Sequence, residues 1–182
     1  MENFETFRQT VSELFSEHGG DLYGGEAINQ KTHGLQCAQL AQDEGAPPYL
    51  IISALLHDIG HFLHDEFEAA QARGEDRFHE NLGADYLARW FGPEVTEPIR
   101  LHVDSKRYLC ATRPDYYDRL SAASQHTLRI QGGAMNDEEV ADFENNASYK
   151  DAIKVRLWDD GGKDPVMKTA DLDYFLTYAD KI

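Results

Sequence analysis

Hydrophobic residues recur at helical spacing along most of the chain, and the first segment shows the pattern clearly. Five apolar side chains there fall on one helical face: Phe4, Phe7, Val11, Leu14 and Phe15. The pair Gly19-Gly20 follows, and glycine is common where helices end. The pattern predicts an amphipathic helix that packs one face against a core.

The most apolar stretch of the chain follows Pro47-Pro48 and reads YLIISALLHDIGHFLHD. Its density of apolar residues predicts a central helix that is mostly buried. A second helix is expected upstream, from about Ala27 to Gln42, ending near Gly45. The polar and charged segment from Glu66 to Arg77 is expected to be a loop or an exposed helix.

Helical patterns continue to the end of the chain. The expected segments are Leu82–Trp90, Glu97–Leu109, Leu120–Ile130, a helix begun by Asn136 with Glu139 as an approximate capping box, Tyr149–Trp158 and Leu172–Tyr178. No run alternates with period two, and no internal repeat or low-complexity linker interrupts the helices. The sequence therefore predicts an all-α fold, a helical bundle that forms one domain over residues 1–182.

Charge narrows the possible partners. The 182 residues include 17 Lys and Arg against 33 Asp and Glu, for a formal net charge of -16. This field repels phosphate backbones, so no nucleic-acid partner is expected, although a local cationic cluster would still admit a small anion. The apolar run Leu50–Leu56 is too short to cross a bilayer, and no signal peptide is evident. Cys37 and Cys110 allow at most one disulfide, so we expect a cytoplasmic protein with two buried thiols.

Histidines carry the strongest chemical signal, and the pair His57-Asp58 stands within the apolar central stretch. Ionisable side chains are costly there unless they are compensated, and a metal ion compensates imidazole and carboxylate together. The other interpretation is a core histidine whose partner is the aspartate. His61 lies one turn further on and would overhang the same site. Three other histidines are expected at the surface or in packing: His18, His64 and His126.

Four residues occur in the order H…HD…D: His33, His57, Asp58 and Asp159. This order resembles the HD-domain superfamily, whose members are all-helical metal proteins and typically phosphohydrolases. Two further histidines, His79 and His102, fall between the HD pair and the last aspartate. Four histidines and two aspartates suit a dinuclear site with positions left open for solvent, substrate and oxygen, and such ligands without a thiolate suit iron or manganese.

Six blocks sharpen the resemblance: YGGEAINQKTHGLQCAQLA, ALLHDIGHFL, FHENLGADYLARWFG, LHVDSKRYL, LSAASQHTLRIQGGAM and VRLWDDGGKDP. Together they resemble the mixed-valent di-iron HD oxygenases that cleave the carbon–phosphorus bond of hydroxyphosphonates. The resemblance covers most of the chain. It implies two iron ions as an Fe(II)/Fe(III) pair, O2 as co-substrate and a small organophosphonate as substrate. It also implies a functional link to an upstream 2-oxoglutarate-dependent hydroxylase.

The resemblance assigns the iron ligands residue by residue. Six positions match: His33, His57, Asp58, His79, His102 and Asp159. Asp58 matches the bridge between the two ions. Asp159 is preferred to Asp160 because of its spacing to Lys163, and this choice stays open between the two aspartates.

The same resemblance implies a substrate site. Four positions match the neighbourhood that receives the phosphonate oxygens: His61, Lys106, Ser124 and Arg156. A dianionic head group needs donors and positive charge, which these side chains supply. Thr127 and Gln131 are weaker candidates for contacts with the same phosphonate oxygens. Without the resemblance, the lysine and the arginine would be read as solvated surface charges and the serine as a helix-interior hydroxyl.

Tyr23 and Glu26 match a segment before the first ligand helix that is mobile in relatives. There, a tyrosine can occupy the iron position that oxygen later needs, and a glutamate addresses the substrate cation. With His61, they complete the expected catalytic residues. The alternative reads them as turn and helix-start residues, where the helix dipole favours glutamate.

The resemblance implies a reaction that takes 1-hydroxy-2-(trimethylammonio)ethylphosphonate to glycine betaine and phosphate, or the 2-amino-1-hydroxyethyl analogue to glycine and phosphate. We favour the trimethylated substrate, since the chain is rich in tyrosine and acidic residues. The alternative enzyme is a metal-dependent phosphohydrolase of a nucleotide or phosphomonoester. A third possibility is a non-enzymatic sensor or binding protein that keeps the metal site. The sequence shows no second domain that would receive a signal, which argues against this possibility.

Overall fold

The computed structural model describes residues 3–23, 26–63 and 78–182. Within these ranges the all-α prediction is confirmed, since the single β contact is an isolated antiparallel bridge between Leu22 and Asn29. None of the helices in the described ranges is long and apolar enough to span a membrane.

The helices follow one another along the chain with short connections. They are α1 (Phe4–Glu17), α2 (Gln30–Asp43), α3 (Pro48–Leu56), the 3-10 helix η1 (Ile59–Leu63), α5 (His79–Leu87), α6 (Pro93–Arg100), α7 (His102–Thr112), α8 (Tyr116–Arg119), α9 (Ala122–Ile130), α10 (Asp137–Asn145), α11 (Tyr149–Gly161), α12 (Leu172–Leu176) and the 3-10 helix η2 (Thr177–Lys181).

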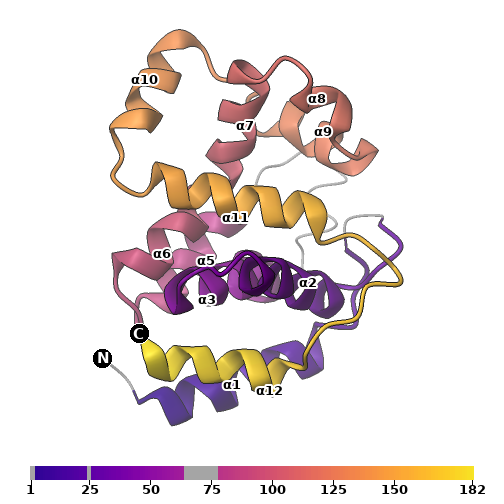
Figure 1. Ribbon diagram of the computed structural model, residues 1–182, viewed down its shortest axis with the longest axis vertical. Helices are drawn as coiled ribbons and strands as arrows, with labels where there is room; N and C mark the ends of the chain where they lie inside the picture. The colour runs from indigo at the N-terminus through magenta and orange to yellow at the C-terminus, as the bar shows by residue number, and fades with distance from the viewer. Residues whose placement is uncertain (1–2, 24–25, 64–77) are drawn as a thin grey trace.

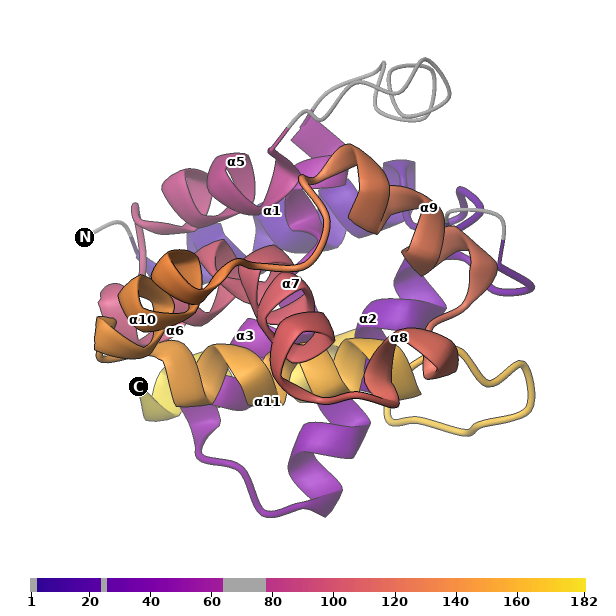
Figure 2. The ribbon, with the colours of Figure 1, turned by 90° about the horizontal axis from the view of Figure 1, so that it is seen from above.

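Helix α11 crosses the middle of the molecule and contacts α2, α6 and α7 (Figure 1). Helices α7 to α10 lie on one side of it, while α1, α2, α3 and α12 lie on the other. Seen from above, α10 stands on one side of α7, and α8 and α9 stand on the other (Figure 2). Elements from distant parts of the sequence therefore meet around α11.

Two groups of apolar side chains hold these layers together. The main core joins α1, α2, α3, α5, α6, α11 and α12, and its fully buried members include Phe7, Leu50, Trp90, Ile99 and Phe175. A smaller cluster joins α7, α8 and α9 through Leu109, Tyr116, Leu120 and Leu128. Burial of each large apolar side chain contributes about 1.5–3 kcal/mol, which outweighs the weak helix propensity of short segments.

The central helix is shorter than predicted. Helix α3 ends at Leu56, His57 caps it, and the chain continues from Ile59 as the 3-10 helix η1. A 3-10 bond from the His61 N–H to the Asp58 carbonyl, 2.9 Å long, follows the break. The HD pair therefore lies at a helix end and not in a continuous helix.

Three other boundaries differ from expectation. Helix α2 begins at Gln30 because the Asn29 side chain accepts a hydrogen bond from the Thr32 N–H, as an N-cap does. The segment expected as one helix from Glu97 to Leu109 divides at Leu101 into α6 and α7. The last expected helix divides in the same way into α12 and η2. The segment from Glu66 to Arg77 lies outside the described residues.

The capping box is confirmed. The Asn136 side chain accepts from the Glu139 N–H at 3.0 Å, and the Glu139 side chain accepts from the Asn136 N–H at 2.9 Å.

Candidate metal centre

Five elements bring the six predicted ligands together, although they span most of the chain. They are His33 on α2, His57 and Asp58 after α3, His79 and His102 at the first positions of α5 and α7, and Asp159 on α11. Gly34 lets α2 approach α3, since a Cβ there would lie 2.8 Å from the Leu55 carbonyl oxygen. The four histidine side chains are buried in this junction.

The histidines form two close pairs. The Nε2 atoms of His33 and His57 lie 3.2 Å apart, and those of His79 and His102 also lie 3.2 Å apart. Metal–nitrogen bonds of about 2.1 Å separate two imidazole ligands of one ion by about 3 Å. Each pair is therefore spaced like two ligands of one metal ion.

Backbone contacts determine how three of these rings face the centre. Their Nδ1 atoms lie at hydrogen-bonding distance from carbonyl oxygens: His33 from Gly162 at 2.7 Å, His57 from Ala54 at 2.9 Å and His102 from Ile99 at 2.7 Å. Because a carbonyl only accepts, each Nδ1 is the donor, and Nε2 carries the lone pair of the neutral ring. Carbonyl partners of this kind are typical of metal-binding histidines.

Two facing lone pairs need a positive charge between them. Burial lowers the pKa of His57 and His102. In their partners, burial is outweighed: Cys37 and Asp159 raise the pKa of His33, and Asp58 raises the pKa of His79. In each pair, burial favours the neutral form of one ring and neighbouring groups favour the charged form of the other, and a metal ion between the two Nε2 atoms would compete with a proton for the same position.

Asp58 lies between the two pairs and offers one oxygen to each. Its Oδ2 is 3.4 Å from His57 Nε2 and 3.7 Å from His33 Nε2, while its Oδ1 is 3.2 Å from His79 Nε2 and 3.6 Å from His102 Nε2. Burial alone would raise the pKa of Asp58, but the surrounding histidines hold it well below its usual value. An ionised carboxylate in this position is suited to bridge two cations.

The adjacent aspartates of α11 face different partners. Asp159 Oδ1 lies 3.4 Å from His33 Nε2, and its Oδ2 lies 4.0 Å from His57 Nε2. Although burial opposes ionisation, the charges of Arg156 and Lys163 hold the pKa of Asp159 well below its usual value. Asp160 instead pairs with Arg156 and accepts from the Tyr116 hydroxyl. This geometry favours Asp159 as the sixth ligand.

The donor set fits two transition-metal ions with nitrogen and oxygen ligands. Among the residues that the structure describes, three groups of side chains have ligand atoms within 4.8 Å of one another: His57, Asp58 and His102; Asp58, His61 and His79; and His33, Cys37 and His57. Only the last contains sulfur. Iron and manganese suit the nitrogen and oxygen set.

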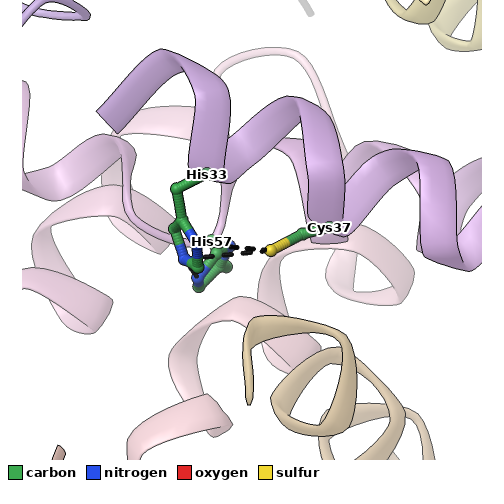
Figure 3. Close-up of side chains that lie close together, drawn as sticks. All are labelled: His33, Cys37 and His57. Carbon is green, nitrogen blue, oxygen red and sulfur yellow. Dashed lines mark hydrogen bonds between the residues drawn. The ribbon is translucent and has the colours of Figure 1, made fainter. Parts of the chain in front are cut away.

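Cys37 is the one thiol beside this centre within the described residues, and the sequence indicated no place for it there. Its Sγ lies 3.8 Å from both ring nitrogens of His33 (Figure 3). The thiol also donates to the Trp158 carbonyl at 3.5 Å. Burial raises the pKa of this thiol, and the neighbouring His33 opposes that shift. The expectation of two buried thiols is correct for Cys37 and wrong for Cys110, which is half-buried because it packs at the edge of the smaller apolar cluster.

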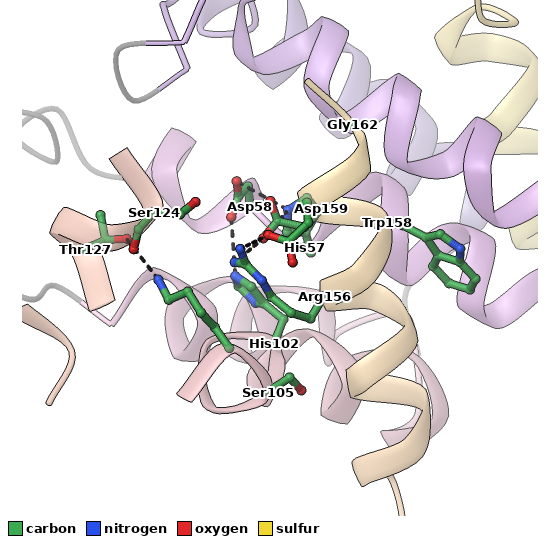
Figure 4. Close-up of polar contacts among 12 residues, drawn as sticks. His57, Asp58, His102, Ser105, Ser124, Thr127, Arg156, Trp158, Asp159 and Gly162 are labelled. Carbon is green, nitrogen blue, oxygen red and sulfur yellow. Dashed lines mark hydrogen bonds and ion pairs between the residues drawn. The ribbon is translucent and has the colours of Figure 1, made fainter. Parts of the chain in front are cut away.

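Cationic and hydroxyl side chains stand beside the histidines. Lys106, 3% exposed, donates to Thr127 Oγ1 at 2.9 Å, and Arg156, 4% exposed, donates to Asp159 Oδ2 at 2.6 Å. Figure 4 shows Ser124 and Thr127 approaching from α9 and Arg156 and Asp159 from α11. Burial, followed by the charge of Arg156, lowers the pKa of Lys106 to about 7. The interpretation of Lys106 and Arg156 as solvated surface charges is wrong.

Lys163 is a further cation that the sequence did not single out as a site residue. Its Nζ donates to Ser124 Oγ at 3.1 Å, lies 3.9 Å from Asp159 Oδ1 and lies 5.6 Å from the centre of the Tyr23 ring. Its position four residues after Asp159, just beyond the end of α11 at Gly161, was the available signal, since a residue at this spacing can reach back to the same helix face.

His61 lies at the edge of the cluster as expected. Its ring stacks on His79 with centroids 4.1 Å apart, and its Nε2 is 3.9 Å from Asp58 Oδ1. Burial, followed by the charge of His79, lowers the pKa of His61 to about 3. The ring is therefore neutral at ordinary pH.

Tyr23 contacts the site, and the Glu26 backbone N–H donates to the Tyr23 carbonyl at 2.7 Å. The Tyr23 hydroxyl donates to Asp159 Oδ1 at 3.0 Å, and its ring stacks on His33 with centroids 3.7 Å apart. Within the described residues, Glu26 Oε1 and Gln131 Oε1 are buried without a hydrogen-bond partner. Buried polar atoms of this kind are unusual in folded proteins, and a bound ligand is one way to satisfy them.

Of the histidines without a matching role, His126 is exposed on α9 and His18 is half-buried against Phe62. His64 lies outside the described residues.

Comparison with known proteins agrees with this picture. The HD domain profile matches residues 31–141. A [1-hydroxy-2-(trimethylamino)ethyl]phosphonate dioxygenase (glycine-betaine-forming) from Leisingera caerulea is 44% identical over 165 residues, covering 91% of this chain and 84% of the relative. A hydroxymethylphosphonate dioxygenase from Gimesia maris is 48% identical over 169 residues, covering 92% and 84%. An uncharacterized protein of Acanthamoeba polyphaga mimivirus is 33% identical over 168 residues, covering 91% and 77%.

A helical fold, a buried cluster of histidines around the HD aspartate and these matches lead to one conclusion: the chain belongs to the HD-domain family.

Proposed function

We propose that the protein is an iron-dependent dioxygenase that uses O2 to cleave the carbon–phosphorus bond of a 1-hydroxyphosphonate. The two relatives named as phosphonate dioxygenases support this activity. The observation that carries it is the placement of Asp58 between two histidine pairs, with the cations Lys106 and Arg156 alongside. A dinuclear centre next to two buried cations suits a substrate that carries a phosphonate.

The two ions would share one ligand and would each have ligands of their own. His33, His57 and Asp159 would hold one, His79 and His102 the other, and Asp58 both. When bound, a mixed-valent Fe(II)/Fe(III) pair supplies the activation of O2 and the oxidation of the substrate carbon. The overall reaction converts the 1-hydroxyphosphonate and O2 into a carboxylate, hydrogen phosphate and a proton: the C–P bond breaks, one oxygen atom of O2 joins the carbon and the other joins the phosphorus.

The protein's own side chains bind and orient the substrate. Lys106, Ser124 and Arg156 would receive the phosphonate oxygens, because charge-assisted hydrogen bonds are the strongest available to a dianion. Neutral His61 would donate or accept a hydrogen bond at the same head group. Tyr23, stacked over His33, would shield the centre from water until the substrate displaces it.

The far end of the substrate would be cationic. Glu26 Oε1 is buried without a partner within the described residues, and an unpaired buried carboxylate oxygen is costly. The cation of 1-hydroxy-2-(trimethylammonio)ethylphosphonate would compensate this charge, whereas hydroxymethylphosphonate has no group to do so. We therefore propose the trimethylated compound as the preferred substrate and glycine betaine and phosphate as its products.

Such a substrate needs a hydroxyl group on the carbon next to phosphorus. An upstream 2-oxoglutarate-dependent hydroxylase is the class of enzyme that would install it.

Phosphate release by the iron-loaded protein tests the function. We expect release from the trimethylated substrate only when O2 is present, with slower release from the 2-amino analogue and from hydroxymethylphosphonate. Failure to release phosphate from all three compounds would refute the proposal. Release that is independent of O2 would also refute it and would point to a phosphohydrolase.

A further inference from the structure

Two residues without a proposed substrate contact, Tyr116 on α8 and Asp160 on α11, surround the guanidinium of Arg156. Arg156 Nε donates to the Tyr116 hydroxyl at 3.0 Å, and Arg156 Nη2 donates to Asp160 Oδ1. The Tyr116 hydroxyl in turn donates to Asp160 Oδ2. These three side chains form a closed ring of hydrogen bonds.

The ring leaves the arginine only part of its hydrogen-bonding capacity. A guanidinium has five N–H donors. Three of them are directed to Tyr116, Asp160 and Asp159, which leaves two for a ligand. Since the fork of an arginine recognises phosphate-like groups only when its plane is correctly oriented, these contacts decide how the remaining donors face the centre.

Charge and burial make this arrangement rigid. Arg156 is 4% exposed and Tyr116 is 7% exposed, while the Asp160 side chain is 23% exposed, so water has little access to the bond between the arginine and the tyrosine. Burial disfavours the charged guanidinium, but Asp159 and Asp160 hold the pKa of Arg156 well above its usual value. Within the described part of the chain, neither Tyr116 nor Asp160 makes a hydrogen bond or ion pair to a histidine of the metal centre.

We propose that Tyr116 and Asp160 are positioning residues that hold the Arg156 guanidinium in the orientation that receives the phosphonate group. This inference rests on the proposed function, which gives Arg156 its role in binding the substrate. The two residues act through Arg156, so their contribution exists only while the arginine is present.

The first test replaces the tyrosine hydroxyl and measures methylphosphonate binding. Tyr116→Phe should raise the dissociation constant of methylphosphonate for the iron-loaded protein about 5- to 10-fold, as expected for one buried hydrogen bond, measured by anaerobic calorimetry. Iron content should not change. Tyr117→Phe, the same substitution at the exposed neighbouring residue, is the matched control and should leave the constant within about twofold.

A double-mutant cycle separates positioning from general destabilisation. In an Arg156→Lys background, Tyr116→Phe should cause no further rise in the dissociation constant, because the group it orients is gone. A similar rise in both backgrounds, or no rise in the native one, would overturn the proposal. The melting temperature of each variant shows separately whether the fold is weakened.

Asp160→Asn decides the question even if the Arg156→Lys protein does not fold. Removing a negative charge near an anion site would by itself tighten methylphosphonate binding. If Asp160 orients Arg156, its loss should weaken methylphosphonate binding instead, and we expect at least a threefold rise in the dissociation constant. The control is Asp118→Asn at an exposed position, which should leave the constant unchanged. Tighter or unchanged binding would refute the positioning role. If the wild-type protein binds methylphosphonate but releases no phosphate from any of the three hydroxyphosphonates, the proposed oxygenase is refuted and this inference stands.

Discussion

Gly60 lies so close to the backbone of His79 that a Cβ atom on Gly60 would stand 2.0 Å from the His79 carbonyl oxygen. The turn that carries the HD pair therefore packs directly on the start of α5. This contact brings His79 Nε2 to 3.2 Å from Asp58 Oδ1. The absence of a side chain at one position thus sets the geometry of half of the candidate metal centre.

Gly60→Ala should separate these two segments. The contacting atoms belong to the backbone and cannot rotate away, so we expect a loss of about 1–3 kcal/mol in the free energy of unfolding and a lower iron content. Urea unfolding and metal analysis measure the two effects. Gly20→Ala, where a Cβ meets open space, is the control and should change stability by less than about 0.5 kcal/mol. Equal behaviour of the two variants would contradict the role of this contact.

His79→Ala should remove one of the two ions. The substitution deletes the histidine closest to Asp58 Oδ1 and leaves the pair formed by His33 and His57 in place. We expect the iron content to fall by about half and O2-dependent phosphate release to fall at least about 100-fold. His126→Ala, at an exposed histidine of α9, should preserve both. Full iron content in His79→Ala would rule out the six-ligand centre.

Lys106 should make the stability of the metal-free protein depend on pH. Burial, aided by the charge of Arg156, lowers the pKa of Lys106 to about 7 in the folded protein. In the unfolded chain the pKa is about 10.4. Between these values the unfolded state binds the proton that the folded state has lost, so stability rises as the pH increases.

Lys106→Met should remove this rise. The wild type should gain roughly 3–5 kcal/mol relative to the variant between pH 7 and about 10.4, measured by urea unfolding of the metal-free proteins. Lys168→Met, at an exposed lysine, should follow the wild type. Parallel curves for the wild type and Lys106→Met would show that Lys106 is not desolvated in solution.

Glu26→Gln should discriminate between substrates. Loss of the carboxylate charge should raise the KM for the trimethylammonium substrate at least about tenfold, since a desolvated pair of opposite charges is broken. The KM for hydroxymethylphosphonate, which has no cation, should stay within about twofold. Steady-state kinetics on both compounds measure the difference, with Glu17→Gln at an exposed position as control. An equal rise for both substrates would refute the cation-binding role of Glu26.

The helices were predictable where their pattern is local. The spacing of Phe4, Phe7 and Val11 is enough to predict α1, because the burial of one helical face repeats every 3.6 residues. The end of α3 at Leu56 was not predictable in this way, since apolar residues continue to Phe62 and the 3-10 helix after the break packs on α5 through Gly60.

The residues of the candidate site also fall into those that the sequence could identify and those that it could not. His33, His57 and Asp58 could be named from their order in the chain, and their roles as ligands stay predictions. The choice between Asp159 and Asp160 could not be made from spacing alone, because both are acidic and adjacent. Only the direction of each side chain on α11 separates them: Asp159 faces His33, and Asp160 faces Arg156 and Tyr116.

The amino-acid order is sufficient to predict which chemical groups the protein has and which segments are helical, because both follow from residue types and short-range periodicity. The meeting of His33 with His57, of Lys163 with Ser124 and of Tyr116 with Arg156 was decided by packing between distant helices. Distances between such segments depend on how side chains of the whole core fit together, and no local pattern encodes that fit.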